Sequence, residues 1–530
     1  MSVNETITLP GVGRQLIDDQ PSGATQGDLT DALIGTDVWS DQMVAEAGIP
    51  VVDVPFVTVG GGIGSFIMAD FLRVAGLPTS SIKALGANPE PWTTYEYLTR
   101  VSQIPRQERL RSDSGSCPDN LWGFPAYSIR EAWEAKGLTK KLDPLWNVLT
   151  EPILTDYYTP RAGQVFNAME KEARRIGWSE MHVQGLVRMT RRRTGGGYFT
   201  IFTPEVNTTG TKRVAYRSTY VHLAIGYPGL RFLDDLQAYR QTYEDYTRVA
   251  NAYEPHEHVY DELRRKPGTV VVRGGGIVAS RVLQRLIDDR DNHGAQTQII
   301  HLFRTYVDSS HGPSPFMRRK GKDGWAYQGF NWPKGAWGGQ LKFRLEKLEG
   351  DQRKALYQTM GGTNTPHRKL WLKQLARGRA EGWYQTEIGE VAEVVPGEGG
   401  TVVTRINTAR GQLEIPANHV VDCTGLEADI REHRVLADLM DHSGAGRNVM
   451  GRLDVEKTFQ VRGTDAAPGR IYAVGSATLG GYYCGVDSFL GLQYACLQVA
   501  DDLARQRFVK RIGPGRSLRQ WWRRMRGAQP

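Results

Sequence analysis

Two glycine-rich turns are the part of this sequence best suited to chemistry. The first lies in VPFVTVGGGIGSFIMADFL, residues 54–72, and the second in GTVVVRGGGIVASRVLQRLI, residues 268–287. In each, a short apolar run precedes the glycines and a helix-like segment follows them. A backbone turn of this kind can approach a pyrophosphate closely, and the N-terminus of the following helix offers free N–H groups and a partial positive charge. Each turn is therefore a candidate dinucleotide-binding site.

Small residues occupy matching positions in the two turns. The first glycine permits the tight turn, the second removes a Cβ that would strike the phosphates, and a small third residue lets helix and strand pack closely. A single glycine-rich loop is often purely structural, but two in matching contexts favour a protein that holds two dinucleotides, usually a flavin and the nicotinamide that reduces it. The residues are Gly60, Gly62 and Ser65, with Gly64 beside Ser65, and then Gly274, Gly276 and Ala279.

The residues that follow the next strand of each unit should contact the adenosine ribose. After the second turn, the predicted strand 298–303 ends in Arg304. An arginine there suits a 2′-phosphate, so NADPH is expected rather than NADH. After the first turn, the predicted strand 81–85 should be followed by an acid to bind the FAD ribose, and Glu90 is the best candidate. A strand near Val183 is expected to pass the adenine end of FAD.

The elements that must position these turns follow a recognisable order. An apolar strand at 220–229 ends in a small-residue turn with a proline, and 419–427 repeats the strand-to-glycine pattern. Residues 469–503 predict a strand, a glycine turn and a long helix that could point its N-terminus toward the flavin. We therefore expect an α/β protein with two Rossmann-like doubly wound domains, the NADPH domain inserted in the FAD domain, plus a helical insertion. The expected parts are an acidic N-terminal arm at 1–50, the FAD-binding domain at 51–225 and 426–503, the NADPH-binding domain at 226–425 with its insertion at 305–382, and a basic tail at 504–530.

Six segments, in this order, resemble the two-dinucleotide-binding-domain flavoproteins, especially the NADPH-dependent (class B) flavin monooxygenases. The resemblance covers most of residues 51–503. It implies that the first and last segments hold FAD, that the fourth holds NADPH, and that the others are domain crossings. By the same resemblance Gly475 and Ser476 belong to the FAD site, although these flavoproteins usually carry an aspartate where this chain has Ser476. The segments are GGGIGS at 60–65, AIGYPG at 224–229, EPHEHVYDEL at 254–263, RGGGIVAS at 273–280, VVDCTG at 420–425 and YAVGSA at 472–477.

The resemblance also implies a reaction. NADPH reduces the flavin, the reduced flavin reacts with O2, and the resulting C4a-peroxide oxygenates a small-molecule substrate, so no side-chain nucleophile is needed. Residues 109–133 follow the first unit, where related flavoproteins bring a loop along the isoalloxazine, and Trp122 is a candidate contact there. The candidate catalytic residues are Asp119 and Asn120 on one side of the flavin and Asp487 and Ser488 on the other, with capping of turns as the structural alternative.

Composition narrows the class of protein. A chain of 530 residues with 40% hydrophobic content can form two or three domains. No apolar stretch is long enough to span a bilayer, and the first residues do not read as a signal peptide, so a cytoplasmic location is expected. The cysteines, Cys117, Cys423, Cys484 and Cys496, contain no Cys-x-x-Cys pair, which argues against a dithiol–disulfide reductase. His256 and His258 lie in an irregular stretch, and no metal site is expected.

Charge is concentrated at the two ends. Residues 1–50 carry eight acids and one base, whereas residues 505–526 carry nine bases and no acid, with Trp521 and Trp522 among them. Such a tail could lie on an anionic membrane, stack on nucleic acid, or dock on the acidic arm within the chain or between subunits. The arm is the favoured partner. Insertion residues 341–359 and 368–381 are expected to be helical and to form a lid or substrate domain.

Three functions remain open from the sequence. The favoured one is a monooxygenase that uses FAD, NADPH and O2. The second is an NADPH-flavin reductase that passes electrons to a protein or quinone acceptor. The third is a non-catalytic flavin-binding module of an assembly, organised by the charged ends.

Overall fold

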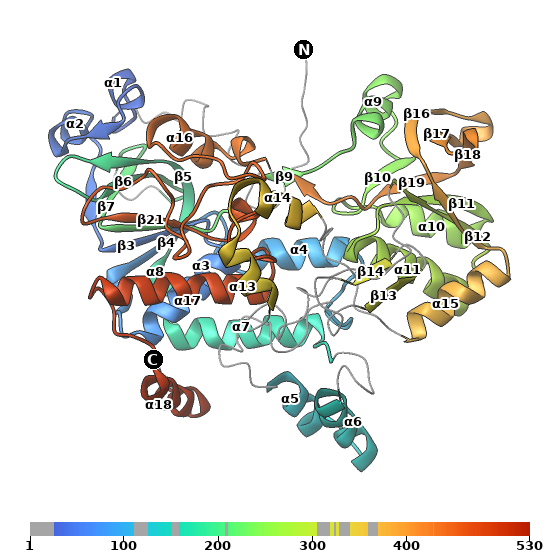
Figure 1. The fold of residues 1–530 in the computed structure, drawn as a ribbon, viewed down its shortest axis with the longest axis horizontal. Coiled ribbons are helices and arrows are strands. Elements are labelled where there is room, and N and C mark those ends of the chain that lie inside the picture. Colours follow the sequence, from blue (N-terminus) through green and yellow to red (C-terminus); the bar gives the residue numbers. More distant parts are fainter. Residues whose placement is uncertain are drawn as a thin grey trace.

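The computed structural model describes residues 26–110, 126–150, 158–206, 210–304, 319–322, 325–327, 340–358, 369–427 and 429–530. Within them the chain forms two lobes, each with its own sheet (Figure 1). Among the described helices, none combines the length and the apolar character that crossing a bilayer requires.

The first lobe contains a nine-stranded sheet made of β1 (Val38–Trp39), β2 (Val51–Asp53), β3 (Phe56–Val59), β4 (Ile82–Gly86), β5 (His182–Arg193), β6 (Tyr198–Pro204), β7 (Val214–Ser218), β8 (Tyr220–Leu223) and β21 (Arg470–Ala473). The strand order is β2-β7-β6-β5-β4-β3-β8-β21, with β1 paired to β5. β21, β8, β3, β4 and β5 are parallel to one another, so their carboxyl ends share one edge of the sheet.

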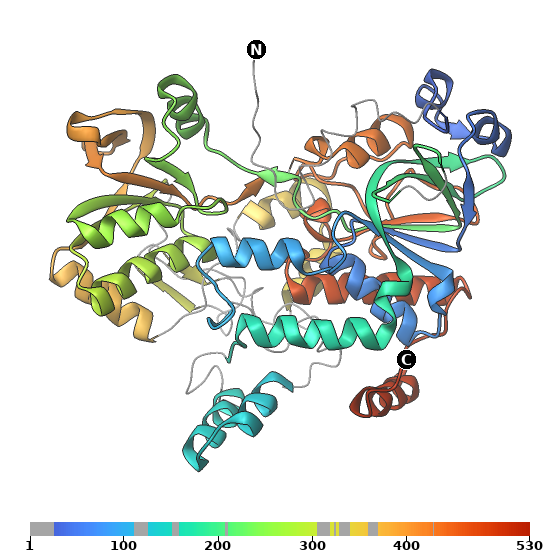
Figure 2. The same cartoon turned by 180° about the vertical axis from the view of Figure 1, so that it is seen from behind.

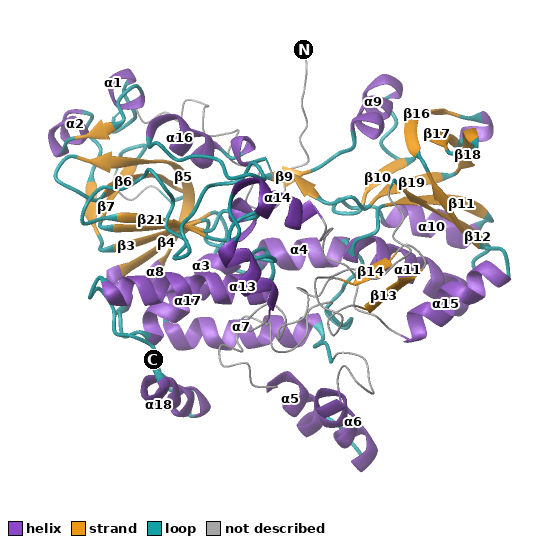
Figure 3. Ribbon diagram, in the orientation of Figure 1, coloured by secondary structure: helices purple, strands orange, loops and turns teal. Residues whose placement is uncertain are grey.

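Helices cover both faces of this sheet (Figure 3). α3 is buried along almost its whole length and packs against α17 and α7, because its residues between Gly64 and Val74 are nearly all apolar or small. α16 packs against β5 on the other side. The helices of this lobe are α3 (Ile63–Val74), α4 (Thr93–Val101), α7 (Ala162–Ile176), α8 (Trp178–Met181), α16 (Arg434–His442) and α17 (Phe489–Arg505).

The second lobe contains a parallel sheet in the order β10-β19-β11-β12-β15, with β10 (Val249–Asn251), β11 (Gly268–Arg273), β12 (Thr297–Phe303), β15 (Tyr384–Ile388) and β19 (His419–Asp422). Its residues are buried on both faces, as expected for a parallel sheet. One face packs against α10 (Glu257–Arg265), α11 (Ile277–His293) and α15 (Lys369–Ala380). The other packs against α9 (Asp234–Tyr243) and the antiparallel strands β16 (Glu390–Pro396), β17 (Val402–Thr408) and β18 (Gly411–Ala417).

The chain passes between the lobes on two adjacent strands. β9 (Gly229–Leu230) carries it out of the first lobe, β20 (Leu426–Glu427) carries it back, and the two pair antiparallel. The second sheet is thus inserted between β8 and β21 of the first. The predicted fold, two Rossmann-like units with one inserted in the other, is confirmed.

The insertion after β12 contributes helices that reach the first lobe. Where helical structure is expected over 341–359, the structure forms two helices, α13 (Gln340–Lys347) and α14 (Gly350–Gln358). Leu348 and Glu349 separate them, and Gly350, the first residue of α14, has a left-handed φ of +50°. α15 agrees with the helix predicted over 368–381. A short hairpin, β13 (Arg319–Lys322) and β14 (Trp325–Tyr327), precedes α13.

The described part of the N-terminal region is built into the first lobe. β1 follows α1 (Asp31–Ile34) and precedes α2 (Asp41–Glu46), and the fully buried Trp39 packs near Phe199. Two further elements lie on the edge of the first lobe beyond α7, the hairpin of α5 (Ala126–Glu134) and α6 (Leu138–Thr150), and the C-terminal helix α18 (Pro514–Met525) (Figures 1 and 2).

Candidate cofactor sites

The first glycine-rich turn lies at the carboxyl edge of the first sheet. The register aligns Val59 with Leu85 and Leu223, so the residue after each strand meets the others. Gly60 has a φ of +121°, and a Cβ on it would lie 2.2 Å from the carbonyl oxygen of Ala224. Only glycine fits there, as the sequence predicts for the tight turn.

Gly62 is different, because the described residues leave room for a Cβ beside it. It is the N-cap of α3, and a Cβ placed on it would meet nothing closer than an oxygen 3.9 Å away. No side chain caps the helix, so the N–H groups of its first turn are free to bind a ligand. Ser65, at the third position, is fully buried with its hydroxyl 2.9 Å from that of Thr58 on β3. This is the close packing of helix on strand that the pattern predicts.

The two ribose and adenine candidates of this site lie near the end of the neighbouring strand. Val183 pairs with Leu85, at the end of β4. Glu90 is exposed, four residues beyond β4, and its carboxylate accepts a hydrogen bond from the Thr93 hydroxyl at the start of α4. Both residues are at the edge where the glycine turn lies. A contact that the sequence did not predict is that of Gly61 with Gly86, where a Cβ on either residue would clash with the backbone of the other.

The final glycine segment meets the first turn. Gly475, with a φ of +79°, starts a short 3-10 helix directly after β21, and the same leucine, Leu492, lies beside both Gly475 and Gly64. Ser476 is buried, and its hydroxyl donates a hydrogen bond to the Gly226 carbonyl at 2.6 Å. Ser476 therefore joins the last glycine segment to the domain crossing.

Of the four candidate catalytic residues, Asp487 and Ser488 are described. Ser488 caps α17, since its hydroxyl accepts from the Gly491 N–H at 3.1 Å and donates to the Gly485 carbonyl. The N-terminus of α17 is thus partly satisfied by its own cap, unlike that of α3. Asp487 accepts a hydrogen bond from the Tyr227 hydroxyl at 2.7 Å. Asp119, Asn120 and Trp122 lie outside the described residues.

Three tyrosines from different parts of the chain lie close enough to Asp487 for its charge to act on them, and Tyr227 also bonds to it. Tyr227 belongs to the domain crossing, Tyr253 to the turn between β10 and α10, and Tyr357 to α14. Burial raises the pKa of each phenol, and the charge of Asp487 raises it further. Asp487 therefore lies where both lobes and the insertion meet. Sequence motifs do not reveal this junction, because its residues come from four separate segments.

At this junction, α14 and the residue before it contact the last segment of the first lobe. The Tyr357 hydroxyl donates to the Gly481 carbonyl at 3.0 Å, and the Tyr482 hydroxyl donates to Glu349 at 2.8 Å. The Arg353 guanidinium stacks 3.9 Å from the centre of the Tyr482 ring. Although it is inserted in the second lobe, this segment is thus attached to the last segment of the first.

The second glycine turn repeats the geometry of the first. Gly274 has a φ of +116°, and a Cβ on it would lie 2.7 Å from the Cys423 carbonyl oxygen at the end of β19. Gly276 is the N-cap of α11, again without a side-chain cap, and Ala279 is fully buried. Arg304 is exposed immediately after β12, at the same edge.

A buried histidine supports this second turn. His301 of β12 lies with Nε2 2.6 Å from the Gly274 carbonyl oxygen and Nδ1 2.9 Å from the Tyr384 hydroxyl. Burial lowers its pKa to about 4, so the ring is neutral at pH 7. No sequence motif singles out His301, and its position inside an apolar strand is the only signal of its role.

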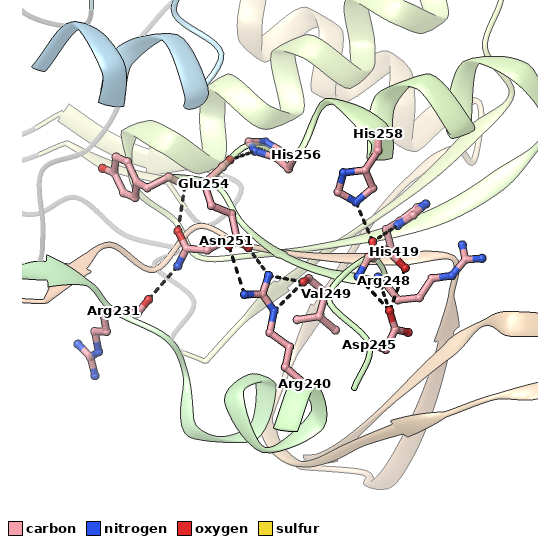
Figure 4. Close-up of polar contacts among 12 residues, drawn as sticks. Arg231, Arg240, Asp245, Arg248, Val249, Asn251, Glu254, His256, His258 and His419 are labelled. Atoms are coloured by element: carbon pink, nitrogen blue, oxygen red, sulfur yellow. Dashed lines mark hydrogen bonds and ion pairs between the residues drawn. The ribbon is translucent and has the colours of Figure 1, made fainter. Parts of the chain in front are cut away.

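The histidine-bearing stretch 254–263 organises the entry to the second lobe (Figure 4). Glu254 forms a buried ion pair with Arg240 and also accepts from the Asn251 N–H at 2.6 Å. His256 bonds to the Glu254 carbonyl and to Tyr260, whereas His258 bonds to the Thr247 carbonyl. The two histidines thus serve local structure, and no cluster of three or more His, Cys, Asp or Glu among the described residues is arranged to hold a metal.

The described cysteines are poor nucleophiles. Cys423, Cys484 and Cys496 are buried as free thiols, and burial raises the pKa of each above its ordinary value. Because the thiolate is the reactive form, these residues are unsuited to disulfide exchange at neutral pH. Cys117 lies outside the described residues.

Comparison with solved structures identifies the class of fold. The ornithine hydroxylase PvdA from Pseudomonas aeruginosa matches with a TM-score of 0.57 at 15% identity, covering 86% of this chain and 99% of that one. The ornithine N-hydroxylase KtzI from Kutzneria sp. 744 matches at 0.58 and 13%, covering 86% and 100%. The FAD-bound cadaverine monooxygenase DfoA from Erwinia amylovora matches at 0.58 and 14%, covering 86% and 94%.

The chain therefore has the two-domain fold found in amine-hydroxylating monooxygenases. At these identities the likeness is one of fold. No protein-family model matches the sequence, and no curated protein does.

Proposed function

We propose that this protein is an FAD- and NADPH-dependent monooxygenase that oxygenates a small-molecule substrate. The observation that carries the proposal is the pair of uncapped helix N-termini, at Gly62 and Gly276, each following a left-handed glycine at the carboxyl edge of a parallel sheet. Each glycine turn, together with the uncapped helix N-terminus that follows it, forms a cradle for a pyrophosphate, and two such cradles suit two dinucleotides. The fold agrees, since PvdA and KtzI are ornithine hydroxylases and the KtzI structure holds FAD and NADP+.

The cradles assign a cofactor to each lobe. FAD would lie on Gly60, Gly62, Gly64 and Ser65, with Glu90 and Val183 toward its adenosine and Gly475 and Ser476 on the opposite side. NADPH would lie on Gly274, Gly276 and Ala279, with Arg304 toward the 2′-phosphate. We assign residues 51–225 and 426–503 to the FAD unit and residues 226–425 to the NADPH unit, and we expect the protein to act in the cytoplasm.

The chemistry of oxygen transfer comes from the flavin when it is bound. The chain's own contribution is to hold the two cofactors at the junction around Asp487 and to exclude water from it. Tyr227 fixes the Asp487 carboxylate through the hydrogen bond between them. A carboxylate held in this way can bind a cationic amine through a charge-assisted hydrogen bond, so primary alkylamines are the substrates to test first.

The nearest alternative is an NADPH-flavin reductase that passes electrons to a separate acceptor. The buried, protonated thiols of Cys423, Cys484 and Cys496 argue against the disulfide-reducing form of this activity. A protein or quinone acceptor remains to be distinguished by experiment.

The deciding experiment combines spectroscopy with oxygen consumption. The purified protein should be yellow or should take up FAD in a titration. Anaerobic NADPH should bleach the flavin faster than NADH does. In air, an amine substrate should couple NADPH oxidation to O2 uptake and to a hydroxylated product detected by mass spectrometry.

Two results would contradict the proposal. NADPH oxidation that continues at the same rate without O2, once a quinone is added, and that yields no oxygenated product would establish the reductase. A protein that fails to bind FAD would exclude both enzymes.

A further inference from the structure

The C-terminal helix α18 turns its apolar face away from the protein. Leu518, Trp522 and Met525 are 61%, 53% and 66% exposed. Their spacing of four and three residues places them on one face of the helix. An amphipathic helix on a globular protein ordinarily buries such a face.

Polar side chains attach α18 to the first lobe instead. Gln520 is buried, and its amide donates to the Val74 carbonyl at the end of α3, as does Arg516 at 3.0 Å. Arg524 forms an ion pair with Glu172 of α7, with 3.4 Å between the charged atoms. These three residues are spaced by four and form the inner face. The apolar face of α18 therefore points away from the protein and is available to bind another surface.

The hairpin of α5 and α6 has the same character. Its anchored side is fixed by Glu131, which pairs with Arg109 at 2.5 Å and accepts a hydrogen bond from Tyr158. Large apolar residues are exposed elsewhere on the hairpin, one near the end of α5 and four at helical spacing along α6. These residues are Trp133 (86% exposed), Leu138 (75%), Leu142 (54%), Trp146 (54%) and Leu149 (80%).

The two elements share one edge of the molecule and one sign of charge. In both views they lie beyond α7, on the side away from α1 and α9 (Figures 1 and 2). Residues 505–526 carry nine bases and no acid, and Arg519 and Arg526 are exposed beside the apolar face of α18. The hairpin exposes Lys136, Lys140 and Lys141. Exposed tryptophan and leucine flanked by bases is the composition of helices that lie in the headgroup region of anionic membranes.

The acidic N-terminal region, as far as it is described, is occupied elsewhere. Asp28 pairs with Lys212 and Arg213, and Asp41 pairs with Arg193 and Arg217, all on β5, on β7 or just before β7. A second copy of the chain is a poor alternative, because a two-fold contact would bring the two basic tails together.

We propose that this edge, formed by α18 and the α5–α6 hairpin, binds the surface of an anionic phospholipid bilayer. The apolar faces of both elements enter the headgroup layer, and the arginines and lysines bind lipid phosphates and carboxylates. The proposal is independent of the catalytic activity.

Vesicle flotation of the full-length protein tests it. The protein should float with vesicles of phosphatidylcholine and phosphatidylserine, and only weakly with phosphatidylcholine alone. Replacing Leu518, Trp522 and Met525 together by serine should weaken binding by about tenfold or more. Arg519→Gln with Arg526→Gln should weaken it by about fivefold for each arginine, and the remaining binding should fall as salt is raised. The matched control is Arg410→Gln with Leu413→Ser, two exposed residues of the β17–β18 hairpin, which should bind as the unmodified protein does.

The hairpin is tested separately with Trp133→Ser, Leu138→Ser and Leu149→Ser, which should also lose binding. All variants should keep the original circular dichroism spectrum and melting temperature. If a triple variant does not, binding by the Arg519→Gln, Arg526→Gln variant and the salt dependence of binding test the proposal in its place. Absence of flotation, or equal binding by the α18 variants and the control, would overturn the proposal. So would a dimer in light scattering that the α18 variants dissociate, or tail-dependent binding of an oligonucleotide in a protein that ignores vesicles.

Discussion

Gly60 and Gly62 lie two residues apart in the same turn, but the structure requires glycine only at position 60. A Cβ on Gly60 would clash with the protein's own backbone, whereas a Cβ on Gly62 would make an ordinary contact of 3.9 Å with the described residues. The fold therefore requires glycine at position 60, whereas the proposed ligand would require glycine at position 62. Adding one methyl group at each position therefore tests the two roles separately.

We predict opposite effects from Gly60→Ala and Gly62→Ala. Gly60→Ala should lower the free energy of unfolding of the FAD-free protein by more than about 1 kcal/mol, because of its positive φ and the 2.2 Å contact. Gly62→Ala should change it by less than about 0.5 kcal/mol but weaken FAD binding by about tenfold or more. Urea denaturation and fluorescence titration with FAD measure the two quantities. Unchanged FAD affinity in folded Gly62→Ala would remove the pyrophosphate from this turn.

A second prediction concerns His301. Its pKa is lowered to about 4 in the folded protein by burial, from an ordinary value of 6.5. Between these values the unfolded chain binds a proton that the folded chain does not, so acid favours unfolding. From pH 7 to pH 4.5 this residue should cost about 2 kcal/mol of stability. His301→Gln should reduce the loss measured by urea denaturation across this range, whereas His258→Gln, at an exposed position, should not. An identical pH dependence in both variants would refute the prediction.

At the scale of elements, parallel strands with aligned ends gather residues that are distant in the sequence. β3, β4, β8 and β21 end at one edge, so the first turn, Gly86, Ala224 and Gly475 become neighbours. The same principle brings Gly274, Cys423 and Arg304 to one edge of the second sheet. Where the chain enters that sheet, the loop between α9 and α10 is held by the buried Arg240–Glu254 pair.

We predict that Glu254→Gln destabilises the second lobe. It removes one partner of a buried ion pair and leaves the Arg240 charge uncompensated, at a cost of about 3–5 kcal/mol. Glu262→Gln, in the partly exposed pair with Arg248, should cost much less. Thermal and urea unfolding of the two variants provide the comparison. Equal losses would show that the Arg240–Glu254 pair does not hold this entry.

At the scale of the whole molecule, the two lobes are joined by more than the crossing strands. Gln103, in the turn after α4, is buried with a φ of +65°. Its amide nitrogen bonds to Glu257 of α10 at 2.9 Å, and its amide oxygen accepts from Arg285 of α11 at 2.9 Å. Its carbonyl accepts from Arg281. One residue of the first lobe thus fixes two helices of the second.

We expect Gln103→Ala to loosen the arrangement of the lobes without harming either cradle. Two partly buried hydrogen bonds to charged groups are lost, which should lower the free energy of unfolding by about 1–3 kcal/mol. Reduction of bound flavin by NADPH should slow in stopped-flow experiments, because hydride transfer depends on the meeting of the two cofactors. FAD affinity should stay the same. A matching loss of FAD affinity would place the effect in the first lobe alone.

The sequence by itself determined the two glycine turns, the strands and helices around them, and the insertion of one unit in the other. It could do so because glycine positions, apolar runs and helix periodicity are local properties of the chain. The helical structure expected over 341–359 is divided into α13 and α14 at Leu348 and Glu349, a boundary that the helical periodicity of this segment did not indicate.

Only the tertiary structure decided what lies between the lobes. Asp487 was a sequence candidate, but Tyr227, Tyr253 and Tyr357 joined it only when four segments folded onto one junction. His301 became a support for Gly274, and Ser476 a link to Gly226, through contacts across strands. The outward apolar face of α18 follows from the packing of Gln520 and Arg524 against the first lobe. Such contacts depend on the packing of segments far apart in the chain, which no local pattern records.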